Sequence, residues 1–484
     1  MTLDAENASE QLRSNVFEFL SSEQENCVAL IDAAPGSGKS YSLLQIAKRL
    51  IDSGNSVRVA IVTQTNNQAD DLAISALTDE DHAFESDAVY RFVSDRISKP
   101  DNFGGQWATQ PKGISRAFES IIIGTASKWI GLAASTKSTQ QFDYVLIDEC
   151  YQMTWSTFLQ MLNLGSKFAL IGDKGQIPPV VTVDASRWAH LDIAPNLPAP
   201  VVLRNKLRNS DSFQTFDLKH CRRLPAESIQ YIAPFYADPQ ALELGSSVLP
   251  VAAPKDRGLK FASKPNMTRP IQDAIQLSST GEPVLVTLGD EATGDPVESD
   301  CELAQVIRDL TEALLGQEYF QKDDAKNREG VLQLTDIAIC STKRAMNALI
   351  EDELQSVISS YLDGGNDNSD GQALANGGLL VDTPERLQGL QRKVIIAVHP
   401  LSNSLHPSDF DLDTGRLCVM ASRHQIALIL VSRAHVQKTL RQILPNASQA
   451  PGQPDSVGKG HMLHRGFIEK LYEERDKKNR VISI

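Results

Sequence analysis

The sequence lacks the features that mark membrane-spanning or disulfide-rich proteins. No apolar run approaches the ~18 residues that a membrane helix needs, so no span is predicted. The six cysteines lie far apart without a C-x-x-C pair, which argues against a disulfide framework or a zinc knuckle. Residues 1–22 are acidic and polar, without the basic-then-apolar order of a signal peptide. These absences predict a reducing, cytoplasmic setting.

Positive charge is also scarce. The chain has 47 Lys and Arg against 61 Asp and Glu, a net charge of −14, which by itself does not point to a nucleic-acid partner. The charge is unevenly distributed, however. Residues 201–223 carry six basic and two acidic side chains, whereas residues 289–302 carry six acidic ones and no base. Net charge therefore leaves the partner open.

Short apolar runs alternate with helical patterns along the 484 residues. Strands alternating with helices predict an α/β protein whose parallel sheets are covered by helices on both faces. The runs fall into two groups, which predicts two such domains. The runs interpreted as buried strands are 27–33, 57–63, 120–124, 143–148 and 168–172, followed by 283–288, 336–340, 379–383, 393–398 and 426–431.

Composition suggests where these domains begin and end. We expect a first domain over residues 1–225, with a short insertion near 79–113, and a second over 226–444. Residues 445–484 are interpreted as a linker and a C-terminal helix. A loose stretch at 225–280 and a glycine-rich loop at 364–378 complete the predicted organisation.

The strongest motif is a phosphate loop. Residues 33–40 read AAPGSGKS, which matches G-x-x-x-x-G-K-[ST] except that Ala33 replaces the first glycine. The motif follows an apolar run and opens an amphipathic helix, as it requires. Small residues let backbone N–H groups surround phosphate oxygens, and a helix N-terminus favours negative charge. The alternative is a strand-to-helix turn that binds nothing.

Within this loop we expect Lys39 to reach the β and γ phosphates and the Ser40 hydroxyl to ligate Mg²⁺. The remaining nucleotide contacts are assigned to Ala34, Pro35, Gly36, Ser37 and Gly38. A second motif, residues 142–149 (FDYVLIDE), is an apolar run ending in two acids. Asp148 is expected to hold the metal and Glu149 to position and deprotonate the attacking water. Together the two motifs predict a nucleoside-triphosphate hydrolase.

Further motifs resemble superfamily 1 helicases, and in particular their up-frameshift-like branch. Residues 148–152 (DECYQ) are similar to motif II and residues 172–180 (GDKGQIPPV) to motif III. Seven such motifs occur in family order. The others are residues 65–72 (TNNQADDL) for motif Ia, 124–126 (GTA) for Ic, 218–225 (LKHCRRLP) with Phe235-Tyr236, 383–389 (TPERLQG) for V and 416–423 (RLCVMASR) for VI.

The resemblance implies two RecA-like domains that bind ATP between them and a single strand of DNA or RNA across their top. Arg222, near the predicted domain boundary, and Arg423 would act as arginine fingers on the γ phosphate, which Gln176 would sense. Gly389 of motif V would also approach the nucleotide. The residues assigned to backbone phosphates of the strand are Thr65, Asn66, Thr125 and Thr383.

Some positions depart from the family pattern. Cys221 stands where a tyrosine commonly stacks on adenine, and a thiol cannot stack. Gln391 replaces the glutamate of motif V. For the adenine-reading glutamine, Gln11 ranks first, although it lies further upstream than usual, and Gln24 lies too close.

Other chemistry is less strongly indicated. His461 and His464 have the spacing of a metal pair, but without a third ligand a solvated helix face is the favoured interpretation. The tryptophans could stack on bases but are more often core or edge residues. Trp129, just after motif Ic, is the one chosen for a test.

Three functions remain open from the sequence. The first is an ATP-dependent helicase or translocase on single-stranded nucleic acid, moving 5′ to 3′ by analogy with the branch. The second is an ATP-controlled switch or scaffold that binds a protein partner and does not travel. The third, a phosphate-loop kinase or other nucleotide hydrolase, leaves motif III and residues 383–423 unexplained.

Overall fold

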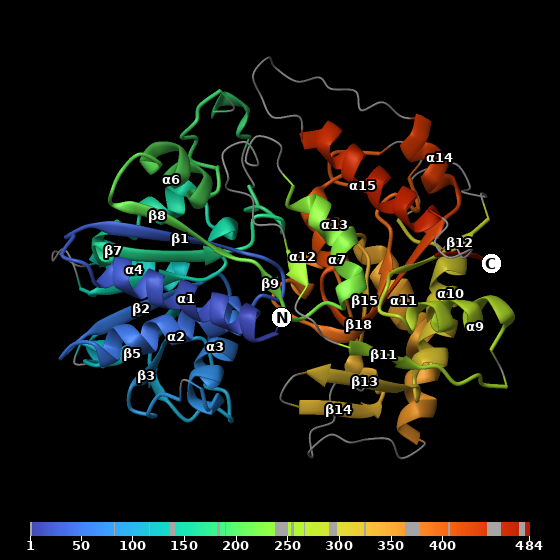
Figure 1. Cartoon of the computed structure of the whole chain (residues 1–484), viewed down its shortest axis with the longest axis horizontal. Helices are drawn as coiled ribbons and strands as arrows, with labels where there is room; N and C mark the ends of the chain where they lie inside the picture. Colours follow the sequence, from blue (N-terminus) through green and yellow to red (C-terminus); the bar gives the residue numbers. More distant parts are fainter. Residues whose placement is uncertain are drawn as a thin grey trace. The chain divides into compact units, whose positions relative to one another are not determined.

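A computed structural model describes most of the chain (Figure 1). The described residues are 2–81, 83–115, 117–135, 141–181, 184–188, 190–237, 250–252, 256–265, 267–289, 298–323, 326–363, 378–404, 407–442, 456–473 and 480–484. Most of the predicted glycine-rich loop, most of the predicted linker and most of the acidic stretch at 289–302 lie outside them. Within them, no helix is long and apolar enough to cross a membrane.

The chain forms two compact units. The first contains residues 3–174 and 178–220, and the second contains residues 175–177 and 221–484. The division falls at His220, in a two-residue strand, β9 (His220–Cys221). Each unit is described separately below.

The first unit is an eight-stranded parallel sheet in the order β4-β3-β5-β2-β6-β7-β1-β8. Its strands are β1 (Cys27–Ala33), β2 (Arg58–Thr63), β3 (Val89–Phe92), β4 (Gln106–Ala108), β5 (Ser120–Thr125), β6 (Tyr144–Ile147), β7 (Lys167–Gly172) and β8 (Phe213–Leu218). Its helices are α1 (Thr2–Ser21), α2 (Lys39–Asp52), α3 (Asn66–Thr78), α4 (Ala126–Ser135), α5 (Trp155–Leu159) and α6 (Ala199–Leu207).

The second unit is a six-stranded parallel sheet in the order β16-β15-β17-β18-β12-β19. Its strands are β12 (Val284–Leu288), β15 (Ile337–Cys340), β16 (Leu380–Asp382), β17 (Arg392–Val398), β18 (His424–Arg433) and β19 (Val481–Ser483). Its helices are α7 (Ala226–Ile232), α9 (Arg269–Ser278), α10 (Cys301–Leu314), α11 (Arg344–Asp363), α12 (Pro384–Leu387), α13 (Thr414–Ala421), α14 (His435–Gln442) and α15 (Ser456–Tyr472).

The two sheets share one topology. The central strands of the first unit lie in the order β8-β1-β7-β6-β2, and those of the second in the order β19-β12-β18-β17-β15. Counted along the chain, both orders are fifth, first, fourth, third, second. Each unit is thus a RecA-like α/β core, which confirms the predicted fold class, and all ten predicted strands are present within one or two residues of their expected ends.

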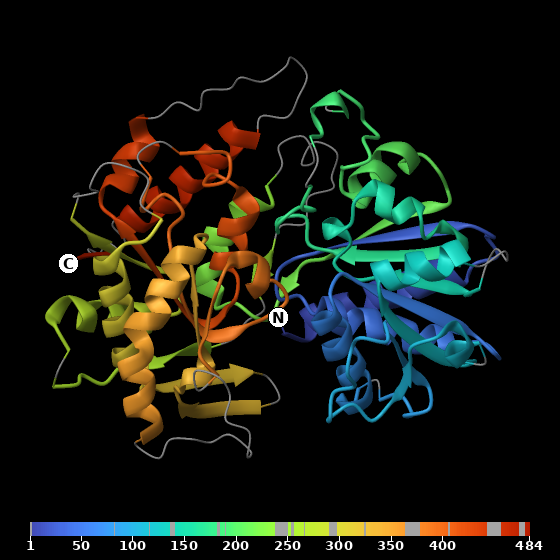
Figure 2. The same cartoon turned by 180° about the vertical axis from the view of Figure 1, so that it is seen from behind.

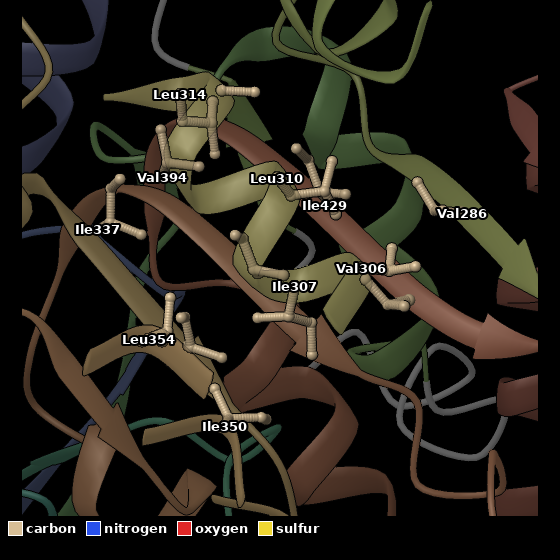
Figure 3. Packing of buried hydrophobic residues seen from close by; sticks show 14 of the residues in the cluster. Val286, Val306, Ile307, Leu310, Leu314, Ile337, Ile350, Leu354, Val394 and Ile429 are labelled. Atoms are coloured by element: carbon tan, nitrogen blue, oxygen red, sulfur yellow. The ribbon is translucent and has the colours of Figure 1, made fainter. Parts of the chain in front are cut away.

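Helices cover both faces of each sheet because successive strand residues point to opposite sides. In the second unit, Val286 and Ile429 pack on one face against α9, α10 and α11, and Leu285 and Leu430 on the other against α7 and α13–α15. Figure 2 shows the molecule from the opposite direction, with α10 and α11 in view. In Figure 3 the apolar stripe of α10 packs against the sheet and α11. The residues of that stripe are Val306, Ile307, Leu310 and Leu314.

Some elements were not predicted. The expected insertion at 79–113 contributes β3 and β4, which extend the first sheet beyond β5. The second unit carries a separate antiparallel sheet, β11-β13-β14, made of β11 (Asp256–Lys260), β13 (Glu318–Asp323) and β14 (Lys326–Val331); a further short strand, β10 (Val251–Ala252), pairs with β9. The segment predicted as linker and helix also supplies β19, which pairs with β12.

Candidate nucleotide and nucleic-acid sites

The phosphate loop joins the end of β1 to the start of α2. Gly36 and Gly38 have positive φ angles of 67° and 82°, and alternating left-handed residues are the backbone conformation that gathers N–H groups around an anion. The Ser37 hydroxyl donates to the Ala34 carbonyl at 2.7 Å and fixes the turn. Ala33 still belongs to β1, in register with Leu218, so its extended backbone does not require glycine.

Lys39 lies among carboxylates at the first turn of α2. Its Nζ is 3.2 Å from Glu149 Oε1 and 3.8 Å from Asp173 Oδ2. All three side chains are largely buried, so these charges are weakly screened by water. Asp173 was not among the predicted site residues, although it lies within the motif III sequence. The amine is therefore held beside the two acids at the mouth of the phosphate loop.

Asp148 and Glu149 follow the carboxyl end of β6. The Ser40 hydroxyl donates to Asp148 Oδ2 at 3.3 Å, so the two predicted metal ligands are adjacent. Burial, and then the charge of Glu149, raise the pKa of Asp148 to about 6. Glu149 has a left-handed backbone with φ of 49°, uncommon outside glycine, and its N–H donates to Asp148 at 2.9 Å.

This donor set fits Mg²⁺. Magnesium prefers oxygen ligands and is commonly held by one or two carboxylates while keeping several waters. One carboxylate and one hydroxyl at hydrogen-bond distance meet that requirement. Among the described residues no group of three or more His, Cys, Asp or Glu could hold a metal by itself, so a cation here would also need ligands from a bound phosphate or water.

Gln176 contacts two residues of the second unit, to which residues 175–177 belong. Its Oε1 accepts from Arg423 at 2.8 Å and from Gln388 at 3.1 Å. Arg423 is only 1% exposed. The structure therefore brings together the predicted residues of motifs III and VI, and adds Gln388 of motif V, which the sequence analysis did not select.

Arg222 is partly buried just after β9, at the beginning of the second unit. Its backbone carbonyl accepts from Arg257 at 3.0 Å. Cys221 beside it is fully buried in the core of the second unit. Gly389 has a φ of 90° in the turn after α12, a conformation that favours glycine.

The two glutamines considered for adenine have local partners. Gln11 is exposed on α1 and its amide donates to Asn15 at 2.8 Å. The Gln24 amide donates to the Asp211 carbonyl at 3.2 Å. These contacts are structural, and the role of Gln11 stays a prediction.

The predicted strand-contacting residues follow carboxyl ends of parallel strands. Thr125 ends β5 and Thr65 follows β2, so they share one edge of the first sheet, and Thr383 follows β16 of the second. Thr65 caps α3, because its hydroxyl accepts from the Gln68 N–H at 3.2 Å. Asn66 points to the protein interior, where its Oδ1 accepts from Arg91 at 3.0 Å.

Arg91 was not predicted and is fully buried. Besides Asn66 it pairs with Asp70 at 2.7 Å, so it fixes the first turn of α3 to the added strand β3. No motif marks Arg91, since its role depends on β3, a strand that the sequence analysis did not predict.

Trp129, chosen as a test of base stacking, is fully buried between Phe92 and Phe142, and its indole N–H donates to the Ile61 carbonyl at 3.0 Å. It is a core residue, as the favoured interpretation of the tryptophans predicted. One other expectation needs correction. His461 and His464 were expected on a solvated helix face, but both are buried where α15 packs on the second unit.

Comparison with known families and proteins agrees with the motif assignment. Residues 18–182 match the family model described as an AAA domain. The chain is 25% identical over 203 residues to the DNA replication ATP-dependent helicase/nuclease DNA2 of Saccharomyces cerevisiae, which covers 42% of this chain and 12% of the relative. It is 27% identical over 163 residues to JHS1 of Arabidopsis thaliana, another helicase/nuclease of that description, covering 33% and 12%.

A third relative, the probable RNA helicase armi of Drosophila melanogaster, is 26% identical over 196 residues, covering 34% of this chain and 16% of the relative. The matches span less than a fifth of the length of each of these relatives. Among solved structures, a type ISP restriction-modification enzyme, LlaBIII, bound to DNA has a TM-score of 0.46 at 12% identity, covering 99% of this chain and 31% of that one. Dbp5 of S. cerevisiae bound to RNA has a TM-score of 0.45 at 9% identity, covering 100% and 93%.

The matched family region contains the phosphate loop and the Asp148-Glu149 pair, and the later motifs lie in the second unit in the expected order. The chain is therefore similar to helicases of superfamily 1, in the branch of up-frameshift-like and DNA2-like proteins, and its residues 18–182 match the AAA domain model.

Proposed function

We propose that the protein is an ATP-dependent translocase or helicase that moves along single-stranded DNA or RNA, 5′ to 3′ by analogy with its branch. The observation that carries the proposal is the cluster of Lys39, Ser40, Asp148 and Glu149 at the carboxyl edge of a parallel sheet. Ligands bind at this edge in open α/β sheets. The cluster has the chemistry of a triphosphate hydrolase.

Each side chain has a role in this proposal. Lys39 exchanges its carboxylate partners for phosphate oxygens. Ser40 and Asp148 would hold Mg²⁺, which would neutralise developing phosphate charge. Glu149, released from Lys39, orients a water molecule and takes its proton. Arg222 and Arg423 stabilise the transition-state charge. Gln176 contacts the γ phosphate and, through its hydrogen bond with Arg423, links nucleotide binding to the position of that arginine.

The strand-binding step uses donors that do not read sequence. Thr65, Thr125 and Thr383 offer hydroxyl or backbone N–H groups to phosphates of the strand. Such contacts fix position without base specificity and depend strongly on salt. The net charge of −14 is compatible with a narrow track of phosphate contacts rather than a broad basic surface.

The decisive experiment measures ATP hydrolysis with and without single-stranded DNA and RNA. At low salt we expect stimulation by at least one polymer, with an activation that weakens as salt rises. Duplexes with 5′ or 3′ tails, assayed side by side, report polarity and strand separation. Absence of stimulation by either polymer at low salt contradicts the proposal.

A second candidate function is an ATP-controlled switch that binds a protein partner without travelling. One observation favours it: residues 79–113, where a strand-splitting wedge could be inserted, instead add β3 and β4 to the existing sheet in the described part of that segment. Hydrolysis without strand displacement, together with a nucleotide-dependent protein complex, would support this alternative.

A further inference from the structure

Arg257 lies outside every motif, yet it contacts the backbone of both segments that carry the candidate arginine fingers. Its Nη2 donates to the Arg222 carbonyl at 3.0 Å. Its Nη1 donates to the Arg223 carbonyl at 2.5 Å and, more weakly, to the Gln425 carbonyl at 3.5 Å. Arg257 is 8% exposed, so these bonds form largely away from water. All of these residues belong to the second unit.

A second arginine joins the same two segments from the other direction. The Arg223 side chain donates to the Ser422 carbonyl at 3.2 Å and to Gln391 Oε1 at 3.0 Å. Residues 222–223 are thereby bonded to the turn before β18, directly beside Arg423. Gln391, which stands where motif V has a glutamate, thus bonds to Arg223.

The position of Arg257 in the fold explains why it can reach both segments. It lies on β11, opposite Gln321 of β13 in the antiparallel sheet, and β11 packs beside β18 (Figure 1). The planar guanidinium presents donors in fixed directions, so one side chain can bond several carbonyls at once, whereas a lysine ammonium is a point charge on a flexible stem. The β11-β13-β14 sheet therefore supports the finger segments.

We propose that Arg257 is a positioning residue for hydrolysis: together with Arg223 it sets the spacing between the segments that carry Arg222 and Arg423. This inference rests on the proposed function. Transition-state stabilisation depends on donors held within fractions of an ångström of the developing charge, and misplacement of about 1 Å can cost ~10²-fold in rate. Arg257 contributes by holding the backbone, without touching the nucleotide.

The test compares R257K, R257M and R223M with R269Q, a matched control on α9 whose exposed arginine pairs with Asp273 within its own helix. We expect kcat at saturating polymer to fall about tenfold to a hundredfold in the Arg257 variants, with KM for ATP within about threefold of wild type. R223M is expected to share the pattern and R269Q to match wild type. Thermal unfolding shows which variants are folded at the assay temperature. If R257M is unfolded there, the comparison uses R257K, which keeps the positive charge.

A double mutant separates positioning from general stability. If Arg257 acts through Arg222, then adding R257K to R222A lowers kcat no further, because the finger is already absent. Independent losses that multiply, or an R257K kcat within twofold of wild type while R222A is impaired, overturn the positioning role. If R222A itself retains wild-type turnover, the finger assignment in the proposed function fails instead.

Discussion

At the scale of single residues, the candidate site concentrates features that are costly for stability. Glu149 has a left-handed backbone, and Asp148 is buried beside it with a raised pKa. The buried carboxylates of Asp148 and Glu149 repel each other and lie near a single lysine, Lys39. Arrangements that cost stability in this way persist where function requires them, and the adjacent phosphate loop indicates that the function is nucleotide chemistry.

Removing one of these charges should therefore stabilise the protein while it abolishes turnover. We expect Asp148→Asn to raise the melting temperature by about 2–4 °C, the shift that corresponds to ~1 kcal/mol in a domain of this size, because it removes repulsion with Glu149. ATP hydrolysis should fall to background, since an amide is a poor magnesium ligand. Differential scanning calorimetry without nucleotide measures the first effect.

The control for this measurement is Asp52→Asn on α2, where an exposed carboxylate pairs with Lys48. Exposed pairs contribute little, so this variant should melt close to wild type and remain active. A lower melting temperature for Asp148→Asn would show that its bond with Ser40 outweighs the repulsion.

The residues predicted for the nucleotide site were those that a short motif defines. Lys39, Ser40, Asp148 and Glu149 belong to two motifs that each follow an apolar strand, and the two motifs together predicted that these residues meet although they are about a hundred positions apart. Arg257 and Arg91 could not be found this way, because no motif contains them and the strands that carry them were not predicted. Trp129 follows a motif directly, yet its indole is core, so the general tendency of tryptophan toward core positions predicted its place and proximity to the motif did not.

At the scale of elements, helix α15 illustrates how a polar pattern can be buried. His464 on α15 is 3.4 Å from His399, Nδ1 to Nε2, and both rings are buried. Burial lowers the pKa of His464 to about 4, with His461 lowering it and Asp411 raising it. Burial, with His464 and His435 nearby, lowers the pKa of His399 well below its usual range. The i, i+3 spacing alone could not distinguish this docked face from a solvated one.

These histidines predict an acid-sensitive second unit. In the unfolded chain the pKa of His464 is about 6.5, whereas in the folded state it is about 4. As pH falls from about 6.5 toward 4, His464 therefore binds a proton in the unfolded state but stays neutral in the folded state. Stability is therefore complete above about pH 6.5 and decreases progressively toward pH 4, by up to ~1.4 kcal/mol per pH unit for each such histidine. Urea unfolding between pH 7.5 and 5 measures this slope.

The variant His464→Gln should flatten that slope, because the glutamine amide does not titrate. His190→Gln, at an exposed position of the first unit, provides the matched control and should leave the slope unchanged. A slope equal to wild type in His464→Gln would mean that other groups control the acid sensitivity.

At the scale of the whole molecule, the alternation of strands and helices was sufficient to predict two parallel α/β units, because buried parallel strands have continuous apolar sequences. Several strands that were missed, such as β4, β8 and β19, lie at sheet edges, and β13, in the small antiparallel sheet, has the sequence EYFQKD, so none of them contains a long apolar run. Strand β19 is an example: only Val481 and Ile482 mark it, and its pairing with β12 depends on residues about 200 positions earlier. Arg480 then bonds the Leu277 and Glu282 carbonyls, another long-range contact without a sequence signal.

The effect of ATP on the binding of the whole chain to single-stranded nucleic acid distinguishes a motor from a switch. We expect Glu149→Gln to bind ATP without hydrolysing it, because the neutral amide loses the proton-accepting role while Lys39 is freed for phosphate. Under the motor proposal, ATP should then lengthen the lifetime of the complex with single-stranded polymer about tenfold or more, since hydrolysis no longer drives the conformational change that releases the strand. Fluorescence anisotropy of a labelled oligonucleotide, chased with unlabelled polymer, measures that lifetime.

Lys39→Ala is the control for this experiment, because without the phosphate-binding amine ATP should not alter the lifetime. Wild type should give an intermediate lifetime that shortens as salt rises, in proportion to the number of phosphates contacted. If ATP leaves the polymer complex of Glu149→Gln unchanged but stabilises a protein complex, the nucleotide controls partner binding and the switch becomes the better account. The same variant thus tests both functions, because each function predicts that bound ATP stabilises a different complex. A motor requires a longer-lived complex with the polymer, and a switch requires a longer-lived complex with a protein partner.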